Sequence, residues 1–255
     1  MRDELPRAGG GPLSTEHSPP RHARRAILLD ALGTLLALEP PAPRLRRLLA
    51  QRLGIDVTAA QAQGAIAAEI AFYRAHFDEG RDEASLAALR ARCGEVVRSA
   101  LPASGALGVA PPAALTAMLL DSLHFTVFPD VLPALLAFRA GGARVVVVSN
   151  WDVSLADVLG EREHALLPLL DGVLTSAQSG ARKPAAAIFE QALALAGSAP
   201  EHAVHVGDSL AEDVAGAMGA GIEPILLRRD GGSGPEGVRT IATLAELRPG
   251  SRPRP

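Results

Sequence analysis

The sequence contains very few cysteines and lysines. Cys93 is the only cysteine among 255 residues, which excludes a disulfide-stabilised scaffold and a cysteine-rich metal site. Lys183 is the only lysine among 25 basic residues, and the net charge of −3 gives no basic surface for a nucleic acid. No uninterrupted apolar run reaches the roughly 20 residues that are needed to cross a bilayer. We therefore expect a cytoplasmic protein that binds neither nucleic acid nor membrane.

Aliphatic residues, in contrast, are abundant. Hydrophobic residues make up 48% of the chain and charged residues 21%, a composition typical of a folded globular protein. The two ends differ: residues 1–24 are rich in Gly, Pro and Arg and predict a disordered tail, and residues 246–255 predict a frayed one. Arg24 and Arg25 precede an apolar run, as in an export signal, but Asp30 interrupts that run and argues against export.

The apolar pattern between the two tails predicts an α/β fold with a helical insertion. Residues 26–29 form a short apolar run that is typical of a buried strand. The next long segment has helical spacing, and Gly and Pro divide it into four predicted helices at 44–53, 58–77, 85–101 and 112–123. Beyond it, predicted strands alternate with predicted helices. The strands are expected at 144–148, 172–175, 203–206 and 224–227, and the helices at 130–141, 185–196 and 211–219. We therefore predict a doubly wound parallel sheet in residues 25–37 and 126–245, with an all-helical cap domain inserted at 38–125.

Polar side chains follow the ends of three predicted strands. Asp30 follows the first of these strands, Ser149 and Asn150 follow the second, and Asp208 follows the third. Ligands of doubly wound sheets bind beyond the carboxyl ends of the strands. Lys183 lies in a loop between the last two positions. We therefore expect these groups to gather at one edge of the sheet, where Ser149 binds the substrate through its hydroxyl and Asn150 through the amides of its turn.

This combination of groups suits phosphoryl transfer. A carboxylate such as Asp30 can attack phosphorus and form an aspartyl-phosphate, which splits hydrolysis into two easier steps. Lys183 and Ser149 place donors where negative charge builds up on the phosphoryl oxygens. Asp208 and Asp213 add carboxylate oxygens, which are the ligands that Mg²⁺ prefers. We expect a small-molecule phosphorylated substrate, with Mg²⁺ as the cofactor.

The segments that carry these residues resemble the motifs of the haloacid dehalogenase superfamily of hydrolases. They follow one another in the family's order, at residues 30–35, 145–150, 182–184 and 207–213. The resemblance implies a Rossmannoid core in which Asp30 is the nucleophile, Ser149 binds phosphate and Lys183 is the basic residue. It also implies a Mg²⁺ site made by Asp30, Asp208, Asp213 and the backbone carbonyl of Leu32. The helical insertion resembles the cap of the phosphoglycolate-phosphatase-like branch.

Leu32 departs from the pattern of the family's phosphatases. They usually carry a second aspartate at this position, which acts as the general acid for the leaving alcohol, whereas leucine has no proton to donate. A positioned acid contributes about 10²–10⁴-fold to the rate, so we expect slow hydrolysis of alkyl phosphates. Two explanations reconcile Leu32 with a phosphatase. The substrates have good leaving groups, as aryl or acyl phosphates do, or the acid comes from elsewhere, for which Asp152 is the nearest candidate.

Two alternatives to a phosphatase remain open. A 2-haloacid dehalogenase also fits Leu32, because halide leaves without protonation and relatives with that activity also lack the second aspartate. Those dehalogenases do not need Mg²⁺, however, and usually lack the acidic fourth motif, which this chain keeps. The other alternative is a non-catalytic protein that uses the fold to bind a ligand or partner. The sequence favours the phosphatase and sets no oligomeric state.

Overall fold

The computed structural model describes residues 25–247, so the tail predicted at 1–24 lies outside the described residues. Within residues 25–247, six strands form one parallel sheet in the order β5-β4-β1-β6-β7-β8. In that order their bounds are Gly172–Thr175, Arg144–Ser149, Ala26–Leu29, Ala203–Gly207, Glu223–Leu227 and Arg239–Ile241. The prediction of a doubly wound parallel sheet is confirmed. Among the six strands of this sheet, only the edge strand β8 was not predicted, because its three residues are too few to show an apolar pattern.

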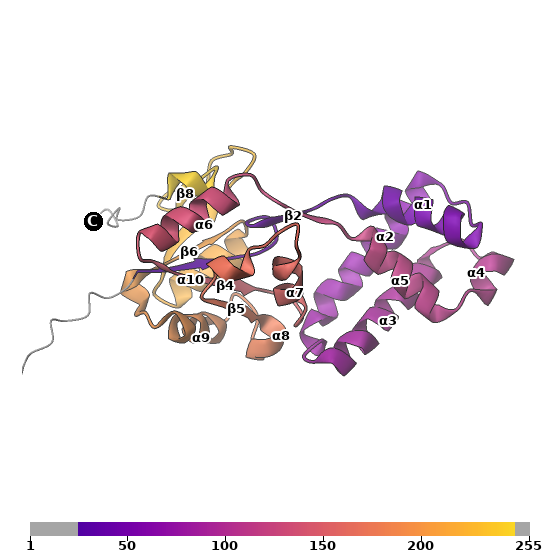
Figure 1. Cartoon of the computed structure of the whole chain (residues 1–255), viewed down its shortest axis with the longest axis horizontal. Coiled ribbons are helices and arrows are strands. Elements are labelled where there is room, and N and C mark those ends of the chain that lie inside the picture. The colour runs from indigo at the N-terminus through magenta and orange to yellow at the C-terminus, as the bar shows by residue number, and fades with distance from the viewer. Residues whose placement is uncertain (1–24, 248–255) are drawn as a thin grey trace, which may run out of the picture.

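Helices cover both faces of the sheet (Figure 1). On one face, α6 (Val131–Ala140) and α7 (Leu155–Gly160) share a buried core with Leu29 of β1. On the other face, α9 (Ala186–Ala196) and α10 (Ala215–Gly219) share a core with Leu28. Successive residues of a strand point to opposite faces, so short runs of aliphatic residues supply both cores. The one-turn helix α8 (Ser176–Ser179) follows β5.

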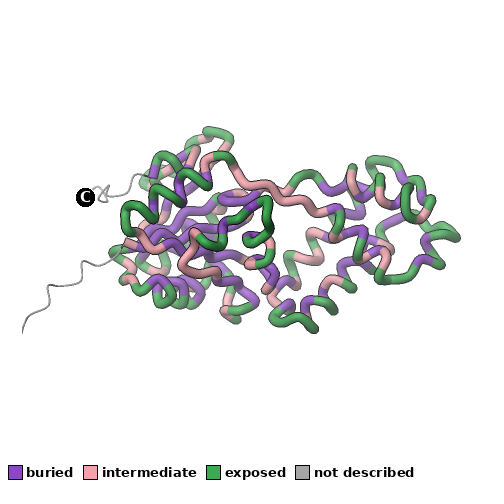
Figure 2. Tube along the Cα trace, in the orientation of Figure 1, coloured by how far each residue is buried: buried purple, intermediate pink, exposed green. Residues whose placement is uncertain are grey.

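Residues 39–124, all of them described, fold into five helices that lie beside the sheet (Figure 1). These helices are α1 (Pro41–Leu53), α2 (Ala59–His76), α3 (Glu83–Ala100), α4 (Gly105–Val109) and α5 (Pro112–Ser122). Figure 2 shows that buried segments run through the inside of this bundle, whose core includes Leu45, Ile66, Leu89 and Leu115. Four of the helices match the prediction. The sequence did not predict α4, because five residues are too few to show a helical period.

Two short strands connect the helical bundle to the sheet. β2 (Leu36–Leu38) and β3 (Phe125–Val127) pair in antiparallel register, with Ala37 opposite Thr126. The sequence did not predict them, because each has three residues and pairs with a segment far away along the chain. The predicted limits of the cap, at residues 38 and 125, fall inside these two strands.

The C-terminal half departs from the prediction in two further places. The helix predicted at 211–219 is divided into a π-helical turn at Leu210–Val214 and the short helix α10. Of the frayed tail predicted at 246–255, the first two residues are ordered: Glu246 ends a 3-10 turn and Leu247 is buried against the core. Residues 248–255 lie outside the described residues. Short 3-10 turns also occur at Phe77–Glu79, Leu167–Leu169 and Pro200–His202. Among residues 25–247, we find no helix whose length and hydropathy suit a bilayer crossing.

Candidate active site

The carboxyl ends of three neighbouring strands bring the predicted site residues together. β1 pairs with β4 on one side and with β6 on the other, in parallel. Asp30 follows β1, Ser149 is the last residue of β4, and Asp208 follows β6. The backbone N–H of Asp30 donates to the carbonyl of Val206 at 2.9 Å, which continues the sheet to the site.

Asp30 receives two side-chain hydrogen bonds on one oxygen. The Ser149 hydroxyl donates to Asp30 Oδ1 at 2.9 Å, and Lys183 Nζ donates to the same atom at 2.6 Å. All three residues are buried, and Lys183 is only 2% exposed. The structure therefore brings together the carboxylate, the hydroxyl and the ammonium that the sequence predicts at this edge.

Lys183 also contacts a second carboxylate. Its Nζ donates to Asp213 Oδ1 at 2.5 Å, so the ammonium lies between two acidic groups. Burial acts to lower the pKa of Lys183, but the charges of Asp30 and Asp213 outweigh it and raise that pKa. Burial also acts to raise the pKa of Asp213, but the charge of Lys183 and a hydrogen bond from His205 outweigh it and lower that pKa. For Asp30 burial is the larger effect, and its pKa is raised.

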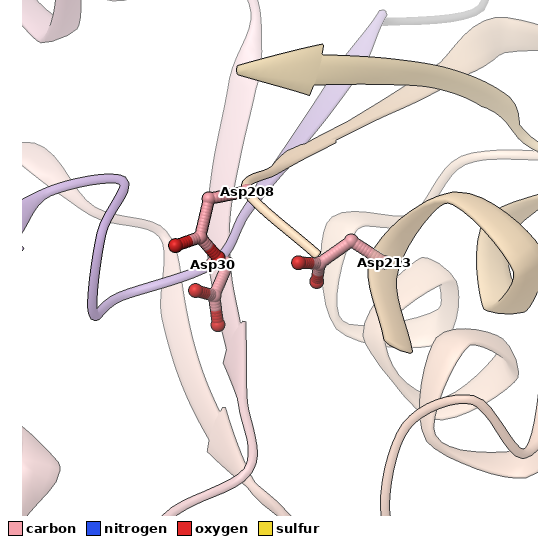
Figure 3. Close-up of side chains that lie close together, drawn as sticks. All are labelled: Asp30, Asp208 and Asp213. Carbon is pink, nitrogen blue, oxygen red and sulfur yellow. The ribbon is translucent and has the colours of Figure 1, made fainter. Parts of the chain in front are cut away.

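Three carboxylates converge at this edge: in Figure 3 that of Asp208 lies just above that of Asp30, and that of Asp213 lies to the right of both. One oxygen from each lies within 4.8 Å of the others. Hard, anionic oxygens are the donors that Mg²⁺ prefers, so this set of residues fits the ion that the sequence predicts. The contact expected from the backbone carbonyl of Leu32 stays a prediction.

Gly33 leaves the space that Asp208 occupies. Its φ of +81° is a conformation that favours glycine, and a Cβ at this position would lie 2.0 Å from Asp208 Oδ2. Burial, together with the charges of Asp30 and Asp213, raises the pKa of Asp208 to about 6. The first and fourth motifs are thus packed against each other, and a cation between these carboxylates would offset their mutual repulsion.

The side chain of Asn150 binds the loop that carries Lys183, and the substrate contact expected near Asn150 stays a prediction. Its side-chain amide donates to the carbonyl of Lys183 at 3.0 Å, and its Oδ1 accepts from the Lys183 N–H at 2.8 Å. Both polar atoms of the side chain therefore bind the loop that carries Lys183. Asn150 fixes this loop beside Ser149, and its backbone N–H is the group that stays a candidate for the substrate.

Neither Leu32 nor Asp152 offers an evident proton to a leaving group. Leu32 is half-buried and packs against the core of the sheet. Asp152 is buried, and its Oδ1 accepts from the N–H and the hydroxyl of Ser154, at 2.8 and 2.6 Å. Its Oδ2 accepts from the Tyr73 hydroxyl at 2.9 Å. These three hydrogen bonds engage both oxygens, which favours a structural role for Asp152 over that of a general acid.

Arg229 supports the first motif and was not predicted from the sequence. Its guanidinium donates to the carbonyls of Gly33 and Thr34, at 3.2 and 2.5 Å, and to Asp130 Oδ1 at 2.9 Å. It also lies over the ring of Phe128, 3.7 Å from the centroid. Arginine is common in this chain, so nothing in the sequence distinguishes Arg229 from its surface neighbours.

The helical bundle contacts the third motif and the segment that follows the second motif. Tyr73 of α2 donates to Asp152, as described above, and Arg182, which precedes Lys183, forms an ion pair with Asp78 at 2.5 Å. The Val153 N–H donates to the carbonyl of Gly80 at 3.0 Å. The bundle therefore lies next to the loops that carry Ser149 and Lys183.

Comparison with known protein families agrees with the motifs of this chain. A model of the haloacid dehalogenase-like hydrolases matches residues 24–221. This chain belongs to that family. As a haloacid dehalogenase-like hydrolase, it is 35% identical over 104 residues to a haloacid dehalogenase-like hydrolase domain-containing protein 3 of Xenopus laevis. It is 33% identical over 103 residues to a glyceraldehyde 3-phosphate phosphatase of Methanothermobacter thermautotrophicus. The matches cover 41% and 40% of this chain, and 42% and 45% of those relatives, so the chain spans less than half the length of each.

Two solved structures share the fold over most of this chain. A phosphatase from Thermococcus onnurineus superimposes with a TM-score of 0.60 at 25% identity, covering 87% of this chain and 95% of that one. A 2-haloacid dehalogenase from Pseudomonas syringae superimposes with a TM-score of 0.59 at 23% identity, covering 88% and 96%. The second likeness shows the fold alone.

Proposed function

We propose that this hydrolase is a Mg²⁺-dependent phosphatase that forms an aspartyl-phosphate on Asp30. The observation that carries the proposal is the surroundings of one carboxylate. Lys183 Nζ and the Ser149 hydroxyl both contact Asp30 Oδ1, at 2.6 and 2.9 Å, and two further carboxylates lie within 4.8 Å. The relative named as a glyceraldehyde 3-phosphate phosphatase supports a phosphorylated small molecule as the substrate.

In the first step an oxygen of Asp30 attacks the phosphorus and expels the leaving alkoxide or phenoxide. Both side-chain hydrogen bonds on Asp30 fall on Oδ1, which makes Oδ2 the oxygen more open to the substrate. Lys183 and Ser149 supply positive charge and a hydroxyl donor as the phosphoryl oxygens gain charge. In the second step water attacks the phosphorus of the acyl phosphate, which releases inorganic phosphate and restores the Asp30 carboxylate.

Asp30, Asp208 and Asp213 would hold the Mg²⁺, with the carbonyl of Leu32 as the expected fourth donor. When bound, the ion neutralises part of the charge that separates an anionic nucleophile from an anionic substrate. Without such a cation, three carboxylates face one ammonium at this edge.

We propose that the site acts on phosphates with good leaving groups, such as aryl or acyl phosphates, and that the helical cap at 38–125 selects among them. Leu32 has no proton to donate, and the oxygens of Asp152 already accept three hydrogen bonds. An alkoxide would therefore leave without a positioned acid, whereas a phenolate or a carboxylate leaves readily without one.

One observation favours 2-haloacid dehalogenation as a second candidate. Leu32 occupies the position at which the dehalogenases also lack an aspartate. The convergence of Asp208 and Asp213 on Asp30 argues for the phosphatase, because halide displacement has no use for a divalent-cation site.

A substrate panel separates the two candidates. Purified protein is assayed with p-nitrophenyl phosphate, an alkyl phosphate and 2-chloropropionate, each with Mg²⁺ and with a chelator. If the protein is the proposed phosphatase, we expect Mg²⁺-dependent release of p-nitrophenol, slower turnover of the alkyl ester and no chloride release. Asp30→Asn removes the activity, whereas Asp56→Asn, at an exposed aspartate of the cap, keeps it. Chloride release without Mg²⁺, or no phosphatase turnover above Asp30→Asn, contradicts the proposal.

A further inference from the structure

His205 is a polar side chain inside an apolar layer. It lies on the central strand β6, where Val204 and Val206 face the core that contains α6. His205 faces the opposite layer, next to Leu28 of β1 and Phe189 of α9, and is only 1% exposed. An imidazole in such surroundings costs free energy unless its polar atoms find partners.

The partner of His205 is an acidic residue of the site. His205 Nε2 lies 2.9 Å from Asp213 Oδ1, the oxygen that also accepts from Lys183 Nζ at 2.5 Å. Lys183 Nζ in turn donates to Asp30 Oδ1 at 2.6 Å. A continuous chain of buried polar contacts therefore leads from the middle of the sheet to the candidate nucleophile.

Close packing fixes the positions of Asp213 and of the His205 ring. A Cβ on Gly207 would lie 2.1 Å from Asp213 Cγ, so only glycine lets this carboxylate approach β6. The edge of Phe189 packs on the His205 ring with centroids 5.0 Å apart and an angle of 86°. Gly216 leaves room for Phe189, because a Cβ there would lie 2.5 Å from that ring.

The surroundings of the ring select one tautomer. His205 Nδ1 is buried and has no hydrogen-bond partner among the described residues, whereas Nε2 faces a carboxylate oxygen. A proton on Nε2 has an acceptor in the protein, and a proton on Nδ1 has none. The arrangement therefore fits an imidazole whose Nε2–H donates to Asp213.

Asp213 is consequently held from two sides besides Lys183. His205 donates to its Oδ1, and the Ser209 N–H donates to its Oδ2 at 3.0 Å, across the π-helical turn. These donors determine where Oδ1 lies, and Oδ1 determines where the Lys183 ammonium lies. An ammonium that keeps both of its contacts therefore stays between Asp213 Oδ1 and Asp30 Oδ1.

We propose that His205 is a positioning residue, which orients Asp213 and through it holds Lys183 against Asp30. Its effect on catalysis rests on the proposed phosphatase function, since His205 itself touches neither Asp30 nor a substrate. Supporting residues of this kind fix a site within fractions of an ångström, and a displacement of about 1 Å can reduce a rate about 100-fold.

Three variants test the proposal by steady-state kinetics on p-nitrophenyl phosphate. His205→Leu removes the donor while filling the apolar layer, and kcat is expected to fall about 10- to 100-fold with KM within about threefold of wild type. His205→Gln keeps a side-chain N–H donor and is expected to restore kcat to within about threefold. The control is His202→Leu, at an exposed histidine just before β6, which is expected to leave kcat unchanged.

If His205 had only a structural role, the variants would change the melting temperature without this pattern of kcat values. The proposal is overturned if folded His205→Leu keeps kcat within about threefold of wild type, or if folded His205→Gln is as impaired as His205→Leu.

An NMR measurement on the wild-type protein tests the contact without any activity. Proton–nitrogen spectra that report two-bond couplings in histidine rings are expected to show His205 as the Nε2–H tautomer, assigned by the signals that disappear in His205→Gln. An Nδ1–H tautomer leaves Nε2 with no proton to donate and overturns the proposal. A wild type that shows the Nε2–H signature but hydrolyses no phosphate refutes the phosphatase, not the contact.

Discussion

Replacing the only lysine with arginine tests the geometry of the site while keeping its charge. Lys183 Nζ contacts Asp30 Oδ1 and Asp213 Oδ1, at 2.6 and 2.5 Å, and the residue is 2% exposed. A compact ammonium fits between two buried oxygens, whereas a planar guanidinium is broader and directs its donors in a fixed fork. Lys183→Arg therefore displaces the carboxylates or leaves one without its donor.

The expected magnitudes follow from these two contacts. Loss of one preorganised donor in an active site costs about 10²–10³-fold in kcat, and we expect that loss for Lys183→Arg. Lys183→Met leaves Asp30 and Asp213 buried without a countercharge, which lowers the free energy of unfolding by about 3–5 kcal/mol. Lys183 lowers the pKa of Asp213 below its ordinary 3.8, so this stabilisation is present above pH 3.8 and is lost as the pH falls toward the lowered pKa.

The assay measures kcat on p-nitrophenyl phosphate with Mg²⁺, and urea unfolding without it. Arg52→Lys exchanges the same two residue types in an exposed ion pair with Asp121 and is expected to change neither quantity. A Lys183→Arg variant with kcat within about threefold of wild type would show that the site needs only a positive charge. A difference between wild type and Lys183→Met that grows as the pH falls below 3.8 would refute the assigned ion pair with Asp213.

Three further predictions follow from the same site. Leu32→Asp supplies the missing acid and is expected to raise kcat about 10²-fold or more on alkyl phosphates and much less on p-nitrophenyl phosphate; equal gains on both refute the leaving-group explanation. Gly33→Ala places a Cβ 2.0 Å from Asp208 Oδ2, so it is expected to raise the Mg²⁺ concentration that gives half-maximal activity. The control is Gly54→Ala, at a glycine with a similar positive φ and nothing within 4 Å of the added Cβ, which is expected to leave that concentration unchanged. Saturation of the site to about 100 times Kd is expected to add about 2.7 kcal/mol to the free energy of unfolding. This gain in the free energy of unfolding is expected to weaken as the pH falls below about 6, where Asp208 binds a proton. A melting temperature that does not change when Mg²⁺ is added contradicts the metal site.

Much of the site could be predicted from the sequence, because strand ends in a parallel sheet meet at one edge. Asp30, Ser149 and Asp208 each follow a recognisable apolar run, and this placement is enough to bring them together. Lys183 stands out by composition alone, as the one lysine in an arginine-rich chain.

The contacts between loops could not be predicted, because they depend on tertiary packing. Asn150 precedes Lys183 by more than thirty residues, and only the folded chain shows that its amide binds the backbone of that lysine. The ribbon of β2 and β3 has too few residues for a pattern. His205 lies in the middle of a predicted apolar strand, where a polar residue signals that a buried partner is needed, although the sequence does not say which.

The formation of an aspartyl-phosphate on Asp30 is tested most directly by chemical capture of the phosphorylated residue. Protein turning over p-nitrophenyl phosphate with Mg²⁺ is quenched in acid and reduced with borohydride, which converts an acyl phosphate into an alcohol, and its peptides are analysed by mass spectrometry. We expect homoserine at position 30, in a fraction that depends on substrate and is absent when substrate is omitted. An active enzyme in which residue 30 remains aspartate, while another residue carries the modification, would contradict this expectation.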